Sequence, residues 1–451
     1  MTLLLLLACT GTPVETDDTQ DTVPPDTDDS AVPISYVDSP AEAIDLDPAD
    51  DIVHFELTAA RMTHTIGDYV IDGYAYNGQT PGPTLRAKIG DRVIVDFSNE
   101  LDAVSTIHWH GLTVPYEMDG VLWSQGGVDP GTSFRYEFTL TQAGSFWYHP
   151  HVDTAHQVDH GLYGVLIVED PADPTPDREL VLVFDDWNDP EDEEPDEHDH
   201  GRDEGLWTVN GMPDPAVQLT GGQRVRARLF NTSNHGYLDL GGSQLRWIAG
   251  DQGLLPSAQS PQTIRLGPGD RADVEWLPGD AGWDVLDHSY SNAGPGFGEP
   301  EVRLRVDIAE PTTAGTALDW PFLSGAITPD SPPTLTYVFT GEAGDWFING
   351  ERFPNVTVES LPIQQDSVIE VRNLSGSEHP FHLHGMHFEV LSINGTPPPF
   401  RTIEDTWNLA VYDRIRVSVR PQNPGFWMAH CHILGHAEEG MMTVIEVQPA
   451  R

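Results

Sequence analysis

The residues best suited to chemistry in this sequence stand near its C-terminal end, in the segment HCHILGHAEEGMM. If the segment begins as a strand, His430 and His432 point to one face and Cys431 to the other, because side chains alternate with period two. His436 and Met441 follow, and both can close around the Cys431 thiolate. Cysteine, histidine and a weakly held methionine form the ligand set of a blue-copper electron-transfer centre.

Three more His-x-His pairs stand in apolar surroundings: His108 and His110 in HWHG, His149 and His151 in HPH, and His382 and His384 in HPFHLHG. In a strand the two imidazoles of such a pair lie about 7 Å apart on one face, which suits neighbouring ions better than one shared ion. With His430 and His432, the four pairs suit a cluster of three metal ions with open positions for a small molecule. Imidazole ligation favours copper without excluding zinc or iron, and the adjacent thiolate makes copper the preferred metal.

These pairs need strands to position them, and one strand pattern occurs three times in the chain. GDRVIVDFSN begins at Gly90, GQRVRARLFN at Gly222 and QDSVIEVRN at Gln365, with alternating apolar positions in each copy. Such alternation indicates half-buried strands, and three copies predict three similar β units of a sandwich type. No comparably long stretch has helical periodicity. The chain is therefore predicted to be all-β.

Two Pro-containing breaks divide the repeats, PADPTPD near residue 171 and PTTAG near residue 311. The predicted segments are residues 1–9, 10–44, 45–170, 171–310 and 311–451. The last three are called the first, second and third units. The first and third units carry the His-x-His pairs at comparable places, whereas the second has no such pair in an apolar strand.

The charge balance is strongly acidic, with 72 acidic against 22 basic residues and a formal net charge of −50. This excess disfavours nucleic acid and anionic membrane surfaces as partners and allows neutral or cationic substrates. The densest acidic tract, residues 185–204 with His198 and His200, could recruit metal cations. Such runs are more often solvated loops, and we favour that interpretation.

The N-terminal segment predicts export. The run from Leu3 to Ala8 is too short to span a bilayer and ends in Leu-Leu-Ala-Cys, which resembles a bacterial lipoprotein signal with Cys9 as its lipidated residue. The alternatives are an ordinary cleaved signal or a wrongly assigned start. Residues 10–44 are rich in Asp, Thr and Pro and are expected to form a disordered tether. We therefore expect the protein in the cell envelope, periplasmic or on the outer surface, with a membrane contact only through Cys9.

Taken together, the four His-x-His pairs and the cysteine segment show that the chain resembles a three-domain multicopper oxidase of the bacterial laccase type, from about residue 45 onwards. The resemblance implies three tandem cupredoxin-like domains, each a Greek-key β-sandwich. It also implies four copper ions: one type 1 ion in the third domain, and a cluster of one type 2 and two type 3 ions between the first and third domains.

The resemblance assigns a ligand to each copper by position. Type 1 copper takes Cys431, His379 and His436 with Met441 as the weak axial ligand; type 2 takes His108 and His382; one type 3 ion takes His110, His149 and His432, and the other His151, His384 and His430. Only two cysteines, Cys9 and Cys431, occur in the chain, so no disulfide framework is expected.

The resemblance further implies an oxidase that joins a small-molecule reductant to dioxygen. Single electrons from the reductant enter at type 1 copper and pass through Cys431 to the cluster, where dioxygen is reduced to water. Phenols or aromatic amines are the preferred substrates, because a methionine-rich segment typical of cuprous oxidation is absent and the chain has only 8 Met.

Three alternatives stay open. The first is a metal-ion oxidase for cuprous, ferrous or manganous ions, used in detoxification. The second is a non-enzymatic cupredoxin-fold scaffold of the envelope, which should have lost its metal ligands. A copper nitrite reductase is less favoured, because it requires neither the HCH pair nor three β units.

Proton supply is the remaining prediction. Asp119, in VPYEMDG, resembles the acid that family members place near the cluster, and we predict that it delivers protons; its alternative role is that of a turn aspartate before Gly120. Related bacterial enzymes often have an acidic residue directly after the second type 1 histidine. Here that position is Ala437, followed by Glu438 and Glu439, so the usual second proton path is in question.

Overall fold

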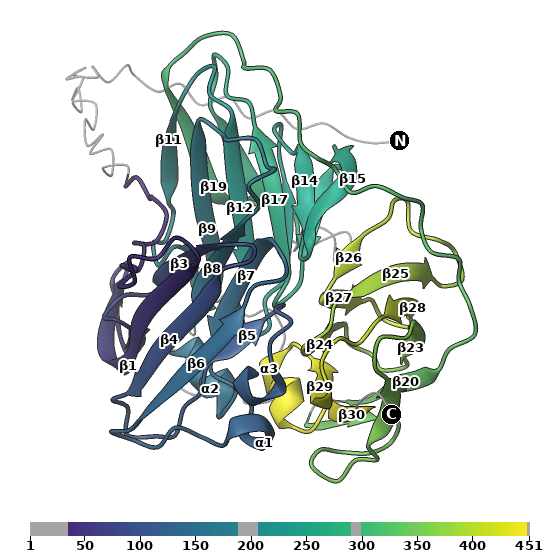
Figure 1. Ribbon diagram of the computed structural model, residues 1–451. Helices are drawn as coiled ribbons and strands as arrows, with labels where there is room; N and C mark the ends of the chain where they lie inside the picture. Colours follow the sequence, from purple (N-terminus) through teal and green to yellow (C-terminus); the bar gives the residue numbers. More distant parts are fainter. Residues whose placement is uncertain (1–34, 188–205, 290–298, 343, 449–451) are drawn as a thin grey trace, which may run out of the picture. The chain divides into compact units, whose positions relative to one another are not determined.

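Strands make up most of the regular structure in the computed structural model, which describes residues 35–187, 206–289, 299–342 and 344–448. The described residues form six β-sheets, two from each predicted unit. Each pair of sheets encloses its own cluster of buried apolar side chains. The predicted all-β fold of three tandem sandwiches is therefore confirmed, with the units running from purple through teal to yellow in Figure 1.

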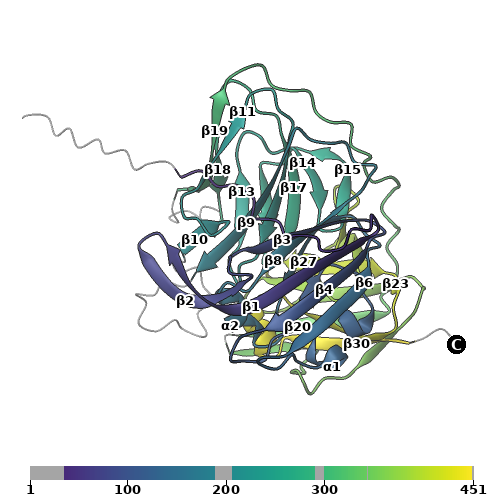
Figure 2. The same ribbon diagram turned by 60° about the vertical axis from the view of Figure 1, so that its left-hand side comes forward.

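The first unit has sheets in the orders β2-β1-β4-β6 and β3-β8-β7-β5. Its strands are β1 (Ile52–Ile66), β2 (Tyr69–Tyr76), β3 (Gly82–Lys88), β4 (Arg92–Asn99), β5 (His108–His110), β6 (Ser133–Thr139), β7 (Gly144–His149) and β8 (Gly164–Glu169). Strands β1, β4 and β6 are seen side by side in Figure 2. The edge strand β5 pairs with β7, which brings the first two histidine pairs to one edge.

The second unit has sheets in the orders β10-β9-β12-β17-β14-β15 and β11-β19-β18-β13-β16. Its strands are β9 (Arg178–Trp187), β10 (Leu206–Val209), β11 (Ala216–Thr220), β12 (Val225–Asn231), β13 (Leu238–Gly241), β14 (Trp247–Gly250), β15 (Gly253–Gln259), β16 (Thr263–Leu266), β17 (Arg271–Trp276), β18 (Trp283–Asp287) and β19 (Glu301–Glu310). It contributes turns, not histidines, to the candidate centres described below.

The third unit has sheets in the orders β21-β20-β23-β28-β25-β26 and β22-β30-β29-β24-β27. Its strands are β20 (Leu335–Glu342), β21 (Asp345–Ile348), β22 (Glu359–Pro362), β23 (Ser367–Asn373), β24 (His379–Leu383), β25 (Phe388–Ile393), β26 (Ile403–Glu404), β27 (Thr406–Leu409), β28 (Arg414–Val419), β29 (Gly425–Cys431) and β30 (Met442–Gln448). The neighbours β24 and β29 align Phe381 with Cys431 and His382 with His430.

The three sequence repeats occupy equivalent places. They form β4, β12 and β23, and each runs parallel to the first strand of its unit: β1, β9 and β20. In β4 the alternating Val93, Val95 and Phe97 are buried in the core. Alternation of this kind buries one face of a strand, which is why the repeat was visible in the sequence.

Two stretches pack into the sandwiches where the sequence predicted a disordered tether and a solvated loop. Residues 35–44 pair with the sandwiches, since Tyr36 bridges to Ala216 and Val37, 6% exposed, lies in the core of the second unit. Asp185 and Asp186, at the start of the acidic tract, belong to β9 and are buried. Cys9, the tether before residue 35, and His198 and His200 lie outside the described residues.

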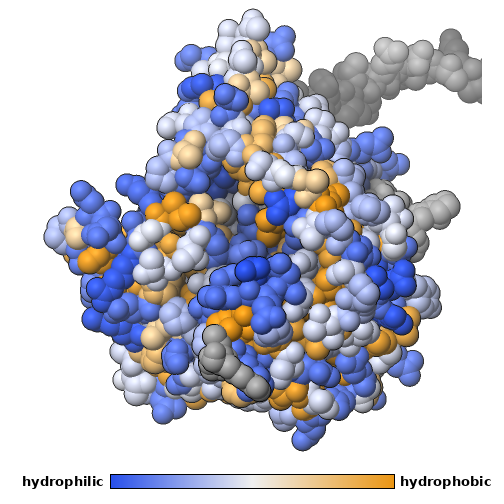
Figure 3. All heavy atoms as spheres, turned by 45° about the vertical axis from the view of Figure 1, so that its right-hand side comes forward, coloured by the Kyte–Doolittle hydropathy of each residue, from blue (hydrophilic) through white to orange (hydrophobic). Residues whose placement is uncertain are grey.

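The described helices are short: η1 (Tyr116–Met118), α1 (Leu122–Gln125), α2 (Thr154–Asp159) and α3 (Leu434–Glu438). None of the helices in the described part of the chain has both the length and the apolar composition needed to cross a membrane. On the face seen in Figure 3, hydrophobic residues form small groups among hydrophilic ones. The helices matter here because α2 follows the second histidine pair and α3 carries His436.

Candidate metal centres

The first candidate centre, the cysteine site, consists of His379, Cys431 and His436. The paired strands β24 and β29 bring His379 and Cys431 together across 52 positions of sequence. Cys431 Sγ lies 3.4 Å from His379 Nδ1 and 3.6 Å from His436 Nδ1, and the two nitrogens are 3.2 Å apart. All three residues are buried. One soft sulfur with two imidazoles matches the equatorial ligands of a blue-copper centre.

Met441 returns to the cysteine site through a turn after α3. The turn contains Gly440, whose φ of 105° favours glycine. The Met441 N–H donates to His436 O at 2.9 Å, and Met441 O accepts from the Cys431 N–H at 3.1 Å. The Met441 side chain is fully buried in the core of the third unit. The backbone therefore ties this methionine directly to Cys431 and His436, two of the three residues that it is predicted to join at a metal.

Surrounding side chains fix the imidazoles of the cysteine site. The Trp346 ring centroid lies 4.1 Å from that of His436, and Ser375 Oγ lies 2.7 Å from His379 Nε2. Burial lowers the pKa of His379 to about 3 and raises the pKa of the Cys431 thiol. The histidine is thus neutral and able to bind a metal, while the thiol gives up its proton only when a cation stabilises the thiolate.

The second candidate centre, the histidine site, lies where the first and third units meet. Its eight histidines come from β5, β7, β24, β29 and the residues that directly follow these strands: His108, His110, His149, His151, His382, His384, His430 and His432. Across the units, the ring of His108 stacks on His384 and that of His110 on His382, each with centroids 3.9 Å apart. The structure therefore brings all four predicted pairs together.

Within this site the predicted ligand groups are close in space. Donor atoms of His151, His384 and His430 lie within 4.8 Å of one another. The type 2 pair is less compact, because the rings of His108 and His382 have centroids 5.9 Å apart. In the remaining group the centroids are 4.8 Å apart for His110 and His432, 5.7 Å for His149 and His432, and 5.8 Å for His110 and His149.

Most of these imidazoles are held by one ring nitrogen. His108 Nδ1 donates to Asp119 O at 2.7 Å, His149 Nδ1 to Pro150 O at 2.9 Å, His382 Nδ1 to Asp405 O at 3.0 Å, His384 Nδ1 to Asp119 Oδ2 at 2.9 Å, and His430 Nδ1 to Cys431 O at 2.8 Å. Hydrogen bonds of this kind set the ring orientation and leave the other nitrogen as the metal ligand.

The opposite nitrogens fit a metal. Among the described residues, these buried ring nitrogens have no hydrogen-bond partner: His108 Nε2, His110 Nδ1, His149 Nε2, His382 Nε2 and both nitrogens of His432. A buried polar atom without a partner is costly, and coordination to a metal ion removes that cost. Burial, reinforced by neighbouring histidines, also lowers the pKa of His149, His430 and His432, and the pKa of His430 falls to about 3. The residues present therefore fit copper.

Asp119 lies against the histidine site and is 1% exposed. It follows η1 and holds two imidazoles, His108 through its backbone oxygen and His384 through Oδ2. Its Oδ1 lies 3.5 Å from His108 Nδ1 and has no hydrogen-bond partner in the described part of the chain. Asp119 is therefore more than a turn residue.

Asp405 is a carboxylate of the histidine site that the sequence analysis missed. Its Oδ1 lies 3.0 Å from His110 Nε2, and the residue is fully buried. The only signal in the sequence is the polar run Glu404, Asp405 and Thr406, which resembles an ordinary turn between strands. In the structure these residues are buried, and that burial could not be deduced from the local sequence.

The position after His436 carries no carboxylate, as the sequence indicated. Ala437 is 6% exposed and lies within α3. The next residue, Glu438, accepts a hydrogen bond at 3.0 Å from the Ala155 N–H at the start of α2. Glu438 therefore joins α3 to α2.

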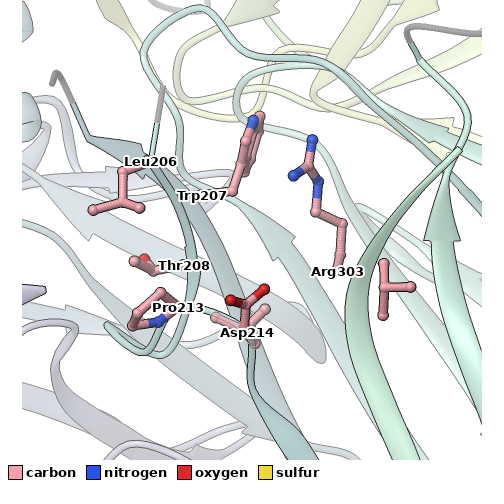
Figure 4. Close-up of a pocket in the computed structure, with 8 residues that line it drawn as sticks. Leu206, Trp207, Thr208, Pro213, Asp214 and Arg303 are labelled. Atoms are coloured by element: carbon pink, nitrogen blue, oxygen red, sulfur yellow. The ribbon is translucent and has the colours of Figure 1, made fainter. Parts of the chain in front are cut away.

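A separate cavity of about 220 Å³ opens in the second unit, beside β10 and β19 (Figure 4). Its cation, Arg303, stacks over Trp207 at 5.0 Å and pairs with Asp287 at 3.0 Å and Glu301 at 2.7 Å. Because the charge of Arg303 is already compensated, this cavity offers no free cation to an anionic ligand.

Comparison with known proteins identifies the family. Two family models, both described as multicopper oxidase, match residues 58–173 and 327–451. A multicopper oxidase of Staphylococcus haemolyticus is 30% identical over 400 residues, covering 82% of this chain and 83% of the relative. A laccase of Trametes hirsuta is 30% identical over 471 residues, covering 85% and 89%.

A solved structure extends this likeness to the fold. The multicopper oxidase from Pseudomonas thermotolerans is 31% identical, covers 89% of this chain and 100% of its own, and superposes with a TM-score of 0.79. The three sandwiches are accordingly cupredoxin-like. The chain belongs to the multicopper oxidase family, bacterial laccase type, and is an oxidoreductase that uses four copper ions, a reducing substrate and dioxygen.

Proposed function

We propose that this oxidase is laccase-like: it takes single electrons from phenols or aromatic amines at the cysteine site and reduces dioxygen to water at the histidine site. The position of Cys431 carries this proposal. Its sulfur belongs to the cysteine site, while its neighbours His430 and His432 belong to the histidine site. The laccase among the relatives and the low methionine content support the substrate class.

The ligands are proposed as the sequence predicts them. Type 1 copper is held by His379, Cys431, His436 and Met441, type 2 by His108 and His382, and the type 3 ions by His110, His149 and His432 and by His151, His384 and His430. Bound copper supplies one-electron transfer and the reduction of dioxygen. The chain orients the imidazoles through hydrogen bonds and connects the two sites through the peptide segment around Cys431.

Asp119 has two roles in this proposal. Through Oδ2 and its backbone oxygen it orients His384 and His108. Its Oδ1, which has no hydrogen-bond partner in the described part of the chain, is the atom that holds a proton for water formation. Asp119 is thus an acid directly beside the proposed copper ligands His108 and His384.

Oxygen uptake with a substrate panel tests the substrate class. The copper-loaded protein should be blue and should oxidise a phenol and an aromatic amine faster than cuprous, ferrous or manganous ions. The copper-free protein is the control and should consume no oxygen. Faster turnover of a metal ion than of the phenol would identify that ion as the substrate in place of the phenol. A colourless, inactive protein with full copper occupancy would refute the oxidase activity itself.

We also propose that the protein is exported and anchored through a lipid on Cys9. The support is the Leu-Leu-Ala-Cys end of the apolar N-terminal run. The full-length chain expressed in bacteria should incorporate labelled palmitate and sediment with membranes. The Cys9→Ser variant should lose the label, and equal labelling of both proteins would contradict the anchor.

A further inference from the structure

The described residues of the second unit supply no histidine to the histidine site, yet two turns of this unit lie against that site. One turn joins β14 to β15 and carries Asp251 and Gln252; the other precedes β17 and carries Gly269. A Cβ added to Gly269 would lie 3.1 Å from the His432 ring and 3.2 Å from His110 Cε1. The φ of Gly269 is 89°, a conformation that favours glycine. The backbone of the second unit therefore forms part of the wall around the histidines.

Arg271, the first residue of β17, reaches from this wall to Asp405. It is 2% exposed overall, and its side chain is completely buried. Its Nη1 lies 2.8 Å from Asp405 Oδ1 and its Nη2 lies 2.5 Å from Asp405 Oδ2, which is a bidentate pair. Such a pair fixes the carboxylate in direction as well as in place, which a single ammonium cannot do.

The same guanidinium joins all three units. Arg271 Nε donates to Ser145 O, in β7 of the first unit, at 2.9 Å, and Nη1 donates to Gly269 O of the second unit at 3.0 Å. The pair with Asp405 adds the third unit. All of these hydrogen bonds from the Arg271 side chain go to groups close to the histidine site.

Asp405 passes this constraint to two imidazoles. Its Oδ1 lies 3.0 Å from His110 Nε2, and its backbone oxygen accepts from His382 Nδ1 at 3.0 Å. Gln252 of the second unit adds a hydrogen bond from Nε2 to Asp405 Oδ2 at 2.7 Å. His110 and His382 are also the two rings stacked across the units, so the single residue Asp405 contacts both sides of that stack, through its carboxylate and its backbone oxygen.

The ion pair of Arg271 and Asp405 packs tightly against Gly111. A Cβ added to Gly111, which directly follows the first histidine pair, would lie 2.6 Å from Arg271 Nη2 and 2.6 Å from Asp405 Oδ2. A shift of the guanidinium would therefore press on the strand end that carries His110. Stability alone is a weak reason for this arrangement, because a buried ion pair is often no more stabilising than apolar packing of the same volume.

From these contacts we propose that Arg271 is a positioning residue for the histidine site: through Asp405 it holds His110 and His382 in the orientation that binds copper. This is the contribution of the second unit, which has no ligand of its own. The proposal rests on the ligand roles given under Proposed function, in which His382 holds type 2 copper and His110 a type 3 ion.

The test compares Arg271→Gln with wild type and with Arg226→Gln in the copper-loaded protein. Arg226 is a matched control, because it is also a buried arginine of the second unit and pairs with Asp273 at 2.6 Å and Asp173 at 2.9 Å, neither of which belongs to the histidine site. The measurements are copper content during dialysis against a chelator, the type 2 signal in electron paramagnetic resonance, and the blue absorption.

Arg271→Gln should lose copper from the histidine site about 10- to 100-fold more readily, with an altered type 2 signal and an unchanged blue band, since the cysteine site has no contact with Arg271. Arg226→Gln should keep the wild-type copper content and type 2 signal. Equal retention in Arg271→Gln and wild type would overturn the proposal, as would parallel loss of the blue band, which would indicate general destabilisation.

If Arg271→Gln does not fold, Arg271→Lys gives the same comparison, because it keeps the charge but not the bidentate geometry. Arg271→Lys should also lose copper from the histidine site more readily than wild type, but less readily than Arg271→Gln. The wild-type protein separates this inference from the proposed function. A wild-type protein without a type 2 signal contradicts the ligand assignment. If the wild-type signal is present and Arg271→Gln has the same copper content and type 2 signal, only the role of Arg271 is contradicted.

Discussion

The Cys431→Ser variant is expected to lose the blue absorption and to oxidise phenols only at background rate, while it keeps the copper ions of the histidine site. The serine hydroxyl cannot replace a soft thiolate, so the cysteine site loses its defining ligand. The neighbouring His430 and His432 keep their backbone positions, because serine is nearly the same size. Absorption spectra, oxygen uptake and copper content of the purified variant measure the three effects.

Met441→Leu is the matched control for this substitution. It changes another buried residue of the cysteine site but leaves Cys431, His379 and His436 in place. This variant should therefore remain blue, with a shifted reduction potential, since the axial ligand tunes the potential of such centres. A Cys431→Ser protein that stays blue would contradict the assignment of the cysteine site.

Asp119→Asn is expected to slow dioxygen reduction by about 10²- to 10⁴-fold, the usual contribution of a positioned proton donor. The amide keeps the size of the carboxylate but removes its charge and its ability to carry the proton. Reduction of the cysteine site by substrate should proceed as in wild type, because the imidazoles that Asp119 holds, His108 and His384, belong to the histidine site. Stopped-flow measurement of blue-band bleaching and of reoxidation separates the two steps.

Glu117→Gln provides the matched control, because Glu117 is an exposed acid in the same 3-10 turn, two residues before Asp119. It should leave both steps unchanged. If the Asp119→Asn variant turns over like wild type with a full copper content, Asp119 has no role in proton delivery. If the variant instead lacks histidine-site copper, its role is confined to orienting His108 and His384.

Much of the arrangement followed from local patterns. The repeats predicted three sandwich units because alternating apolar residues such as Val93 and Val95 must face a core. The His-x-His pairs predicted a shared site because the period of two in a strand puts both imidazoles of a pair on one face, and the first and third units carry such pairs at comparable places. These patterns act over a few residues, which is why they are legible in a single sequence.

Contacts between residues far apart in the chain could not be predicted from the sequence. Arg271 and Asp405 are 134 positions apart and meet only because the second and third units pack together. Residues 35–44 have a tether-like composition, yet Val37 enters the core of the second unit. Trp346, whose ring lies against His436, comes from a short strand with no metal-binding motif. Each of these depends on how sheets are placed against one another, which composition and periodicity do not encode.

The central claim is that a cysteine site collects single electrons and a connected histidine site reduces dioxygen completely. The direct test is the stoichiometry of a one-electron reductant against oxygen uptake in the copper-loaded protein, with hydrogen peroxide assayed in the same vessel. The account predicts four equivalents of reductant for each dioxygen and no peroxide. Two equivalents for each dioxygen, with peroxide released, would contradict it.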